Sequence, residues 1–88
     1  MPERLVTVTN SHGIHARPAA EIVKVAAKFS ANITIARDDL EVNGKSIMGV
    51  MMLAAECGAE VAIRADGADA DAALDALAAL MASNFGES

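Results

Sequence analysis

The sequence predicts a small α+β domain of the open-faced sandwich type, in which helices cover one face of an antiparallel sheet. Four short stretches alternate apolar and polar residues with the period of a strand, and three others have apolar residues at helical spacing. Each stretch has one apolar face, so strands and helices must bury these faces against each other. At 88 residues the chain suffices for one domain and not for two, so residues 1–88 are expected to form a single domain with the order βαββαβα.

The first strand is expected over residues 4–9, where Val6 and Val8 alternate with threonines. A helix follows over about residues 16–28, because apolar residues recur there three and four positions apart. They are Ala19, Ile22, Val23, Ala26 and Ala27. The other side is polar and carries Arg17, Glu21, Lys24 and Lys28. Two interpretations of this side stay open, an ordinary solvated face and a docking stripe for acidic partners.

A hairpin and a short second helix are expected in the middle of the chain. Residues 32–36 and 40–43 alternate around two turn-forming aspartates at 38–39. Ser46 is then placed to cap a helix over about residues 47–53. So short a helix cannot bury all of its consecutive apolar residues, so we expect an exposed patch formed by Ile47, Met48 and Met51. Such a patch suits docking to several partners.

The last strand and helix follow in the same way. Val61, Ile63 and Ala65 alternate with mostly polar residues and predict a strand. The final helix opens at two aspartates, which are favourable at the positive end of the helix dipole. It then presents one apolar face, made up of Ala70, Leu74, Leu77, Ala78 and Met81.

Residues 11–20 carry the functional prediction, because a turn there delivers a histidine to the start of a helix. Gly13 supplies the backbone freedom of the turn, and Pro18 suits an opening helical turn. His15 is therefore expected at or beside the N-cap. The backbone N–H groups of Ala16 and Arg17 would then point at whatever the imidazole carries, with the positive end of the dipole behind them. This arrangement suits a phosphate.

The same surroundings favour a nucleophilic role for His15. A helix N-terminus and a neighbouring arginine disfavour the imidazolium form, and a neutral imidazole is a nucleophile. After attack on a phosphoryl donor, Arg17 and the positive field would stabilise the charge of the transferred group. A lone histidine near a helix start is more often a capping or surface residue. The combination of turn, arginine and proline favours the nucleophile.

Two longer motifs stand out, GIHARPAA at residues 13–20 and GKSIMGVM at residues 44–51. Through both, and over essentially its whole length, the chain resembles the HPr family, the histidine phosphocarriers of the bacterial phosphotransferase system. The resemblance implies the strand order 1-4-2-3. It also implies that enzyme I phosphorylates His15 on Nδ1 with phosphoenolpyruvate as the source, and that Arg17 stabilises the phosphoryl group. IIA-type domains then receive this group from His15, for sugar uptake or regulation. The resemblance further implies that Ser46 is a second, regulatory phosphorylation site, which an HPr kinase/phosphorylase modifies.

Several alternatives bear on this prediction. His12 departs from the small polar residue usual in the family; it is either a modulator that donates to the phosphate or an exposed turn residue without effect. Two histidines without further ligands fall short of a zinc site, so no metal and no cofactor are expected.

The chain offers no acid, base and nucleophile set for a stand-alone enzyme. The rival function is a regulatory protein-binding module, in nitrogen or carbon control, that acts through Ser46 and the second helix.

The composition argues against nucleic acids as partners and against membrane insertion. A formal charge of −5 with only seven basic residues argues against nucleic-acid binding. No apolar run approaches the roughly 20 residues that span a bilayer, so we expect a cytoplasmic protein without membrane insertion. We also expect a monomer. Docking is expected through Ile47, Met48 and Met51 together with Lys24. The single Cys57 is expected to be an at least half-buried core thiol without a role.

Overall fold

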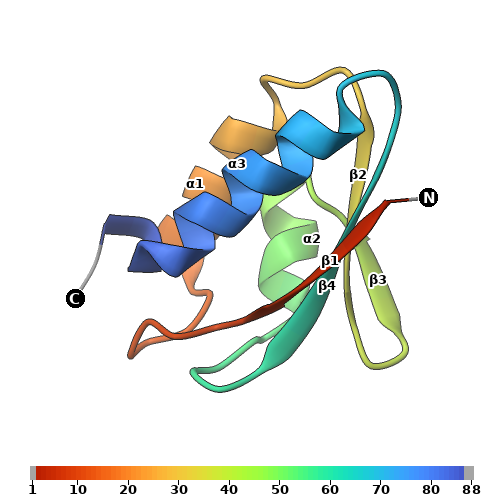
Figure 1. Cartoon of the computed structure of the whole chain (residues 1–88). Coiled ribbons are helices and arrows are strands. Elements are labelled where there is room, and N and C mark those ends of the chain that lie inside the picture. The colour runs from red at the N-terminus through yellow and green to blue at the C-terminus, as the bar shows by residue number, and fades with distance from the viewer. Residues whose placement is uncertain (1, 87–88) are drawn as a thin grey trace.

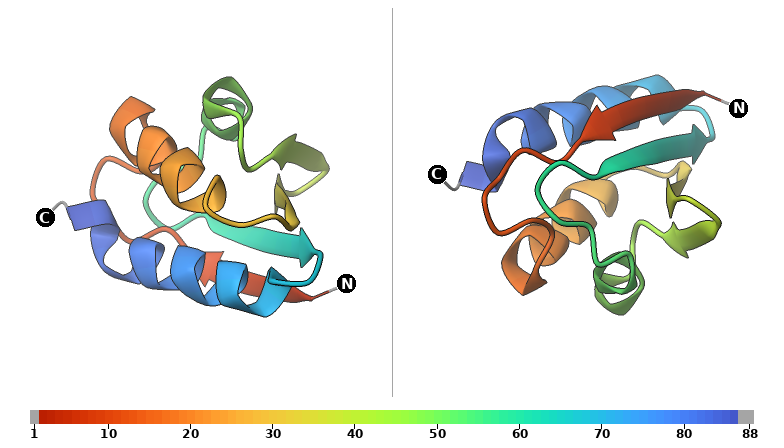
Figure 2. Two further views of the ribbon diagram at one scale, coloured as in Figure 1. Left: turned by 90° about the horizontal axis from the view of Figure 1, so that it is seen from above. Right: turned by 90° about the horizontal axis from the view of Figure 1, so that it is seen from below.

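The structure, a computed structural model, describes residues 2–86. Its elements in chain order are β1 (Glu3–Thr7), α1 (Ala16–Ala26), β2 (Asn32–Arg37), β3 (Leu40–Asn43), α2 (Ile47–Met52), β4 (Glu60–Asp66), α3 (Ala70–Ala82) and the 3-10 helix η1 (Asn84–Gly86). The four strands form one antiparallel sheet in the order β1-β4-β2-β3. The three α-helices lie on the same side of it (Figures 1 and 2). The predicted open-faced sandwich and its strand order are thus confirmed.

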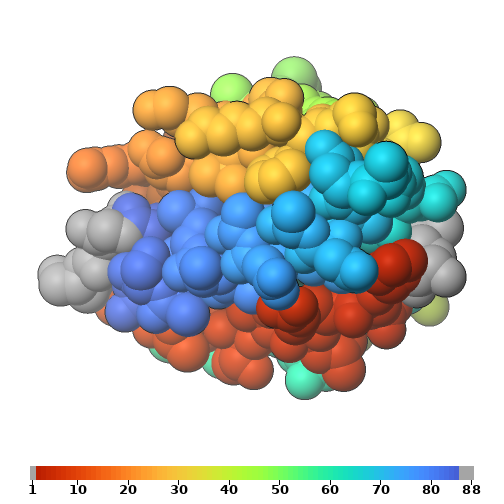
Figure 3. Space-filling model, turned by 45° about the horizontal axis from the view of Figure 1, so that its top comes forward, coloured from red at the N-terminus to blue at the C-terminus, as the bar shows by residue number. Residues whose placement is uncertain are grey.

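The core lies between the sheet and the helix layer. Strand β4 pairs with both β1 and β2, and its inward residues Val61, Ile63 and Ala65 are buried, as their alternation predicts. Helices α1 and α3 lie side by side across the sheet (Figure 3). Ala19 and Ala73 are fully buried in these helices, and such small side chains allow close packing.

Some boundaries and one burial prediction differ from the expectation. Helix α1 ends at Ala26, so that the apolar Ala27 becomes an exposed C-cap. Strand β1 ends at Thr7, although the Val8 N–H still donates to the carbonyl of Ala59. The prediction of an at least half-buried Cys57 is wrong, because this residue lies exposed in the loop between α2 and β4. A loop lacks the periodicity from which burial is inferred.

Asp69 ties the start of α3 to the chain that follows α1. It occupies the N-cap position of α3, but its two carboxylate oxygens accept the N–H groups of Ser30 and Ala31, each at 2.9 Å. These bonds, the Ser30 bond foremost, hold the pKa of Asp69 below its usual value. The carboxylate therefore connects the start of α3 to residues 30–31, which lie 38–39 positions away in the sequence.

Candidate functional site

A network of hydrogen bonds shapes the turn between β1 and α1. The Gly13 N–H donates to the Asn10 carbonyl at 3.1 Å, and the His15 N–H donates to the Gly13 carbonyl at 3.1 Å. The side-chain amide of Asn10, a fully buried residue, also donates to the Gly13 carbonyl, at 2.6 Å. Asn10 was not among the predicted site residues, although an asparagine three positions before a glycine is a typical turn signal. It anchors the turn that presents His15.

The turn rests on the segment that follows α2. The Ile14 N–H donates to the Ala55 carbonyl at 2.8 Å, and the Ile14 and Ala55 side chains are both buried. Gly13 has a φ of +67°, and a Cβ there would collide with the Ala55 carbonyl oxygen and lie 2.8 Å from Cα of Glu56. Glycine is needed here both for the left-handed backbone and for the close approach.

His15 is the N-cap residue of α1, as predicted. Its backbone is extended, with φ −92° and ψ −167°, and its carbonyl accepts the Ala19 N–H at 3.0 Å. Its side chain is exposed and does not cap the helix. The next residues, Ala16 and Arg17, form the first turn, whose N–H groups have no acceptor within the helix. Arg17 is exposed two residues from His15 and Lys24 is exposed in the last turn, so α1 presents positive charge at both ends.

A second imidazole lies beside His15. The ring centroids of His12 and His15 are 6.0 Å apart, and the rings meet edge to face at 85°. Both residues are exposed. Among residues 2–86, no group of three or more histidine, cysteine, aspartate and glutamate side chains is arranged to hold a metal ion.

Helix α2 presents the expected apolar patch. Ser46 Oγ accepts the Gly49 N–H at 3.1 Å, which confirms the predicted cap. The side chains of Ile47, Met48 and Met51 are exposed by 45%, 78% and 43%, whereas Val50 points into the core. Met52 is also exposed, although it was not among the predicted patch residues. We use the name α2 patch for Ile47, Met48, Met51 and Met52.

The site and the α2 patch belong to a part of the chain that a known family model matches. The model described as "PTS HPr component phosphorylation site" covers residues 2–83, which include His15, Arg17 and Ser46. The chain belongs to the HPr family.

Members of the HPr family are similar to this chain over essentially its whole length. The phosphocarrier protein HPr of Treponema pallidum is 47% identical over 99% of this chain and 99% of its own. The crystal structure of HPr-C-His from Thermoanaerobacter tengcongensis covers 100% of this chain and 99% of its own, with a TM-score of 0.96 and 44% identity. A crystal structure of an HPr dimer from the same organism has a TM-score of 0.80 and 45% identity, and covers 99% of this chain and 100% of its own.

Membership of the HPr family sets the class of function. The relatives are phosphocarrier proteins, and this chain is accordingly a phosphocarrier and not a catalytic enzyme. A role in a phosphotransferase system is implied by the family. Within residues 2–86, no helix combines the length and the apolar character needed to cross a bilayer.

Proposed function

We propose that His15 carries the phosphoryl group, which it receives from phosphoenolpyruvate through enzyme I and passes to IIA-type domains. The observation that supports this most directly is the position of His15, an exposed imidazole at the N-cap of α1. In the acceptance step an unprotonated ring nitrogen, Nδ1 by family resemblance, attacks phosphorus. The N–P bond forms as the bond between phosphorus and the donor breaks, and its electron pair leaves with the donor.

The transferred group needs positive partners that hold it without bonding to it covalently. The N–H groups of Ala16 and Arg17 lie at the positive end of the helix dipole, and the Arg17 guanidinium adds charge-assisted hydrogen bonds. His12, edge-on to His15, is the modulator in this proposal and donates to the phosphoryl group. All of these groups act through hydrogen bonds and charge, so the N–P bond stays available for the next transfer.

The α2 patch is the proposed docking surface for both enzyme I and IIA-type domains. Methionine side chains are flexible and adapt to different partner surfaces. Lys24 on α1 adds a positive charge for acidic partner surfaces. We further propose that the chain acts as a cytoplasmic, single-domain monomer, without nucleic-acid partners and without membrane insertion. The net charge of −5 supports the absence of nucleic-acid partners, and a core shared by all main elements supports a single domain.

A second candidate is a regulatory binding module that acts mainly through Ser46 and α2. Ser46 Oγ lies at the start of α2, next to Ile47 and Met48 of the patch, so phosphorylation by an HPr kinase/phosphorylase would place about two negative charges beside the docking surface. In the first candidate this modification is an added control; in the second it is the main signal.

Two steps of a phosphotransfer assay separate the candidates. The purified chain is incubated with phosphoenolpyruvate and enzyme I, and its mass is measured before and after acid treatment. A carrier gains one acid-labile phosphoryl group and loses it when a IIA-type domain is added. A chain that stays unmodified by enzyme I, yet gains an acid-stable phosphate on Ser46 from the kinase, is the regulatory module instead.

A further inference from the structure

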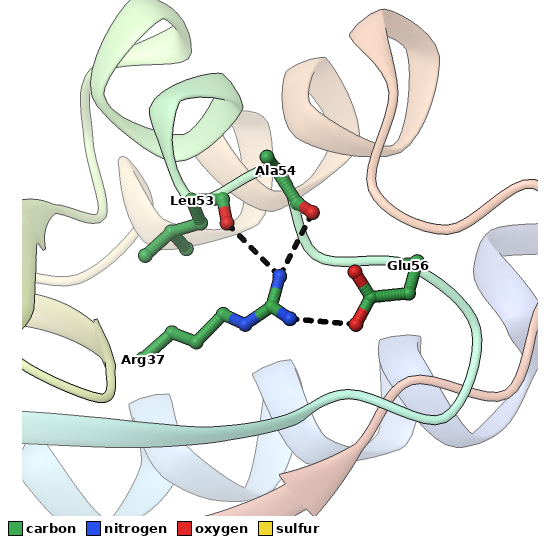
Figure 4. A network of polar contacts seen from close by, with 4 residues as sticks. All are labelled: Arg37, Leu53, Ala54 and Glu56. Atoms are coloured by element: carbon green, nitrogen blue, oxygen red, sulfur yellow. Dashed lines mark hydrogen bonds and ion pairs between the residues drawn. The ribbon is translucent and has the colours of Figure 1, made fainter.

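Arg37 lies at the same end of the sheet as the turn of residues 10–15 (the His15 turn), because the ends of β1 and β2 both lie beside the start of β4. It is the last residue of β2, and its guanidinium points into the bend formed by residues 53–56 (Figure 4). Nη1 donates to the carbonyls of Leu53 at 3.3 Å and Ala54 at 2.8 Å, and Nη2 pairs with Glu56 Oε1 at 2.6 Å. The Arg37 side chain is only 25% exposed. The planar guanidinium thus binds three oxygen acceptors within the four consecutive residues 53–56.

The bend that Arg37 holds has an unfavourable backbone. Leu53 is the C-cap of α2, and Ala54 follows it with a φ of +48°, in the left-handed region that alanine rarely adopts. The last carbonyls of a helix have no partner within it, and an arginine side chain can supply one. Arg37 therefore compensates both for the strain at Ala54 and for the open end of α2.

This bend is also the support of the site. Ala55, between two residues that Arg37 contacts, accepts the Ile14 N–H, and Gly13 approaches the Ala55 carbonyl and the Glu56 backbone too closely for any side chain. A shift of residues 54–56 must therefore move residues 13–14, which directly precede His15. A continuous path of contacts runs from Arg37 to the N-cap of α1.

We propose that Arg37 is a positioning residue for phosphoryl transfer, because it fixes the bend that holds the His15 turn in place. This inference rests on the proposed function of His15. The ion pair itself adds little to overall stability, because the Glu56 side chain is 65% exposed. Transfer, in contrast, is sensitive to geometry, since a displacement of about 1 Å can cost up to about 100-fold in rate. Loss of Arg37 should accordingly slow transfer clearly, while the melting temperature changes little.

The test measures enzyme I kinetics with the carrier as the varied substrate and phosphoenolpyruvate as the source. Arg37→Gln should lower kcat about tenfold with KM within twofold of the wild type, and should speed hydrogen exchange at the Ile14 N–H. Glu56→Gln, which keeps an acceptor at that position and leaves both carbonyl bonds in place, should stay close to the wild type. Arg37→Lys should restore part of kcat, because an ammonium reaches one acceptor but not all three.

Arg4→Gln is the matched control. Arg4 also makes an ion pair of 2.6 Å, but its partner is Asp75 of α3 and not the bend, so its loss should leave kcat and Ile14 exchange unchanged. A phosphorylated wild type together with an Arg37→Gln variant of equal kcat and equal Ile14 exchange would overturn the role of Arg37 alone. A change confined to KM would overturn it as well, in favour of docking. A wild type that enzyme I does not phosphorylate would overturn the proposed function itself, and with it this role.

Discussion

The side-chain amide of Asn10 donates to the Gly13 carbonyl at 2.6 Å from a fully buried position, and so closes the turn that presents His15. Asn10→Ala removes this bond and leaves a small cavity, while the Gly13 carbonyl keeps the His15 N–H as a donor. We expect a loss of about 1–2 kcal/mol in the free energy of unfolding. Urea unfolding measures it, with the exposed Asn32→Ala as the control, expected within about 0.5 kcal/mol of the wild type. Equal stability of both variants would show that the Asn10 bond contributes nothing.

Met48 is the most exposed member of the α2 patch, at 78%. Met48→Asp should weaken binding to enzyme I by more than about 1 kcal/mol, because it places a charge where an apolar contact is expected. Its melting temperature should change little. Leu5→Asp is the matched control, since Leu5 is 61% exposed on β1, away from α2. Titration calorimetry measures both affinities, and an equal loss for the two variants would contradict a docking role specific to α2.

Ser46 combines a structural bond with a proposed regulatory site. Ser46→Ala should cost about 1 kcal/mol of stability, because it removes the acceptor of the Gly49 N–H. Ser46→Asp keeps an acceptor and adds a charge at the positive end of α2, so its melting temperature should equal or exceed that of the wild type. The same charge should slow phosphorylation of His15 by enzyme I. Unaltered transfer in Ser46→Asp would leave this serine as a helix cap alone.

Asp69 makes stability depend on acid pH. Its folded-state pKa lies below the unfolded value, chiefly because of the Ser30 N–H bond. The contribution of Asp69 is therefore fully present above the unfolded pKa and disappears as pH falls through the folded one, below about pH 4. The melting temperature of Asp69→Asn should be lower than that of the wild type at pH 6, and the gap should narrow toward about pH 2. A constant gap over this range would contradict the assignment.

The local elements could be predicted because their signals are local. Alternation in β4 predicted Val61 and Ile63 as inward residues, and the shortness of α2 predicted that Met48 would be exposed. The Ser46 cap followed from residue type and position alone. The order of the strands came from the family resemblance, because period-2 patterns do not specify which strands are neighbours.

The supports of the site could not be predicted, because they join segments that are distant in the sequence. Arg37 contacts a bend 16–19 residues away, and Asp69 binds N–H groups 38–39 residues away. Such contacts depend on how the helices lie on the sheet. Cys57 was placed wrongly for a related reason, since the loop around it has no periodic pattern.

In the proposed function, His15 itself takes the phosphoryl group. The direct measurement is ³¹P NMR of the chain after incubation with phosphoenolpyruvate and enzyme I, for the wild type, His15→Ala and Arg17→Ala. We expect a phosphohistidine signal in the wild type, the same signal reached about 10²–10³-fold more slowly in Arg17→Ala, and none in a folded His15→Ala. A phosphohistidine signal of full intensity in His15→Ala would contradict this proposal.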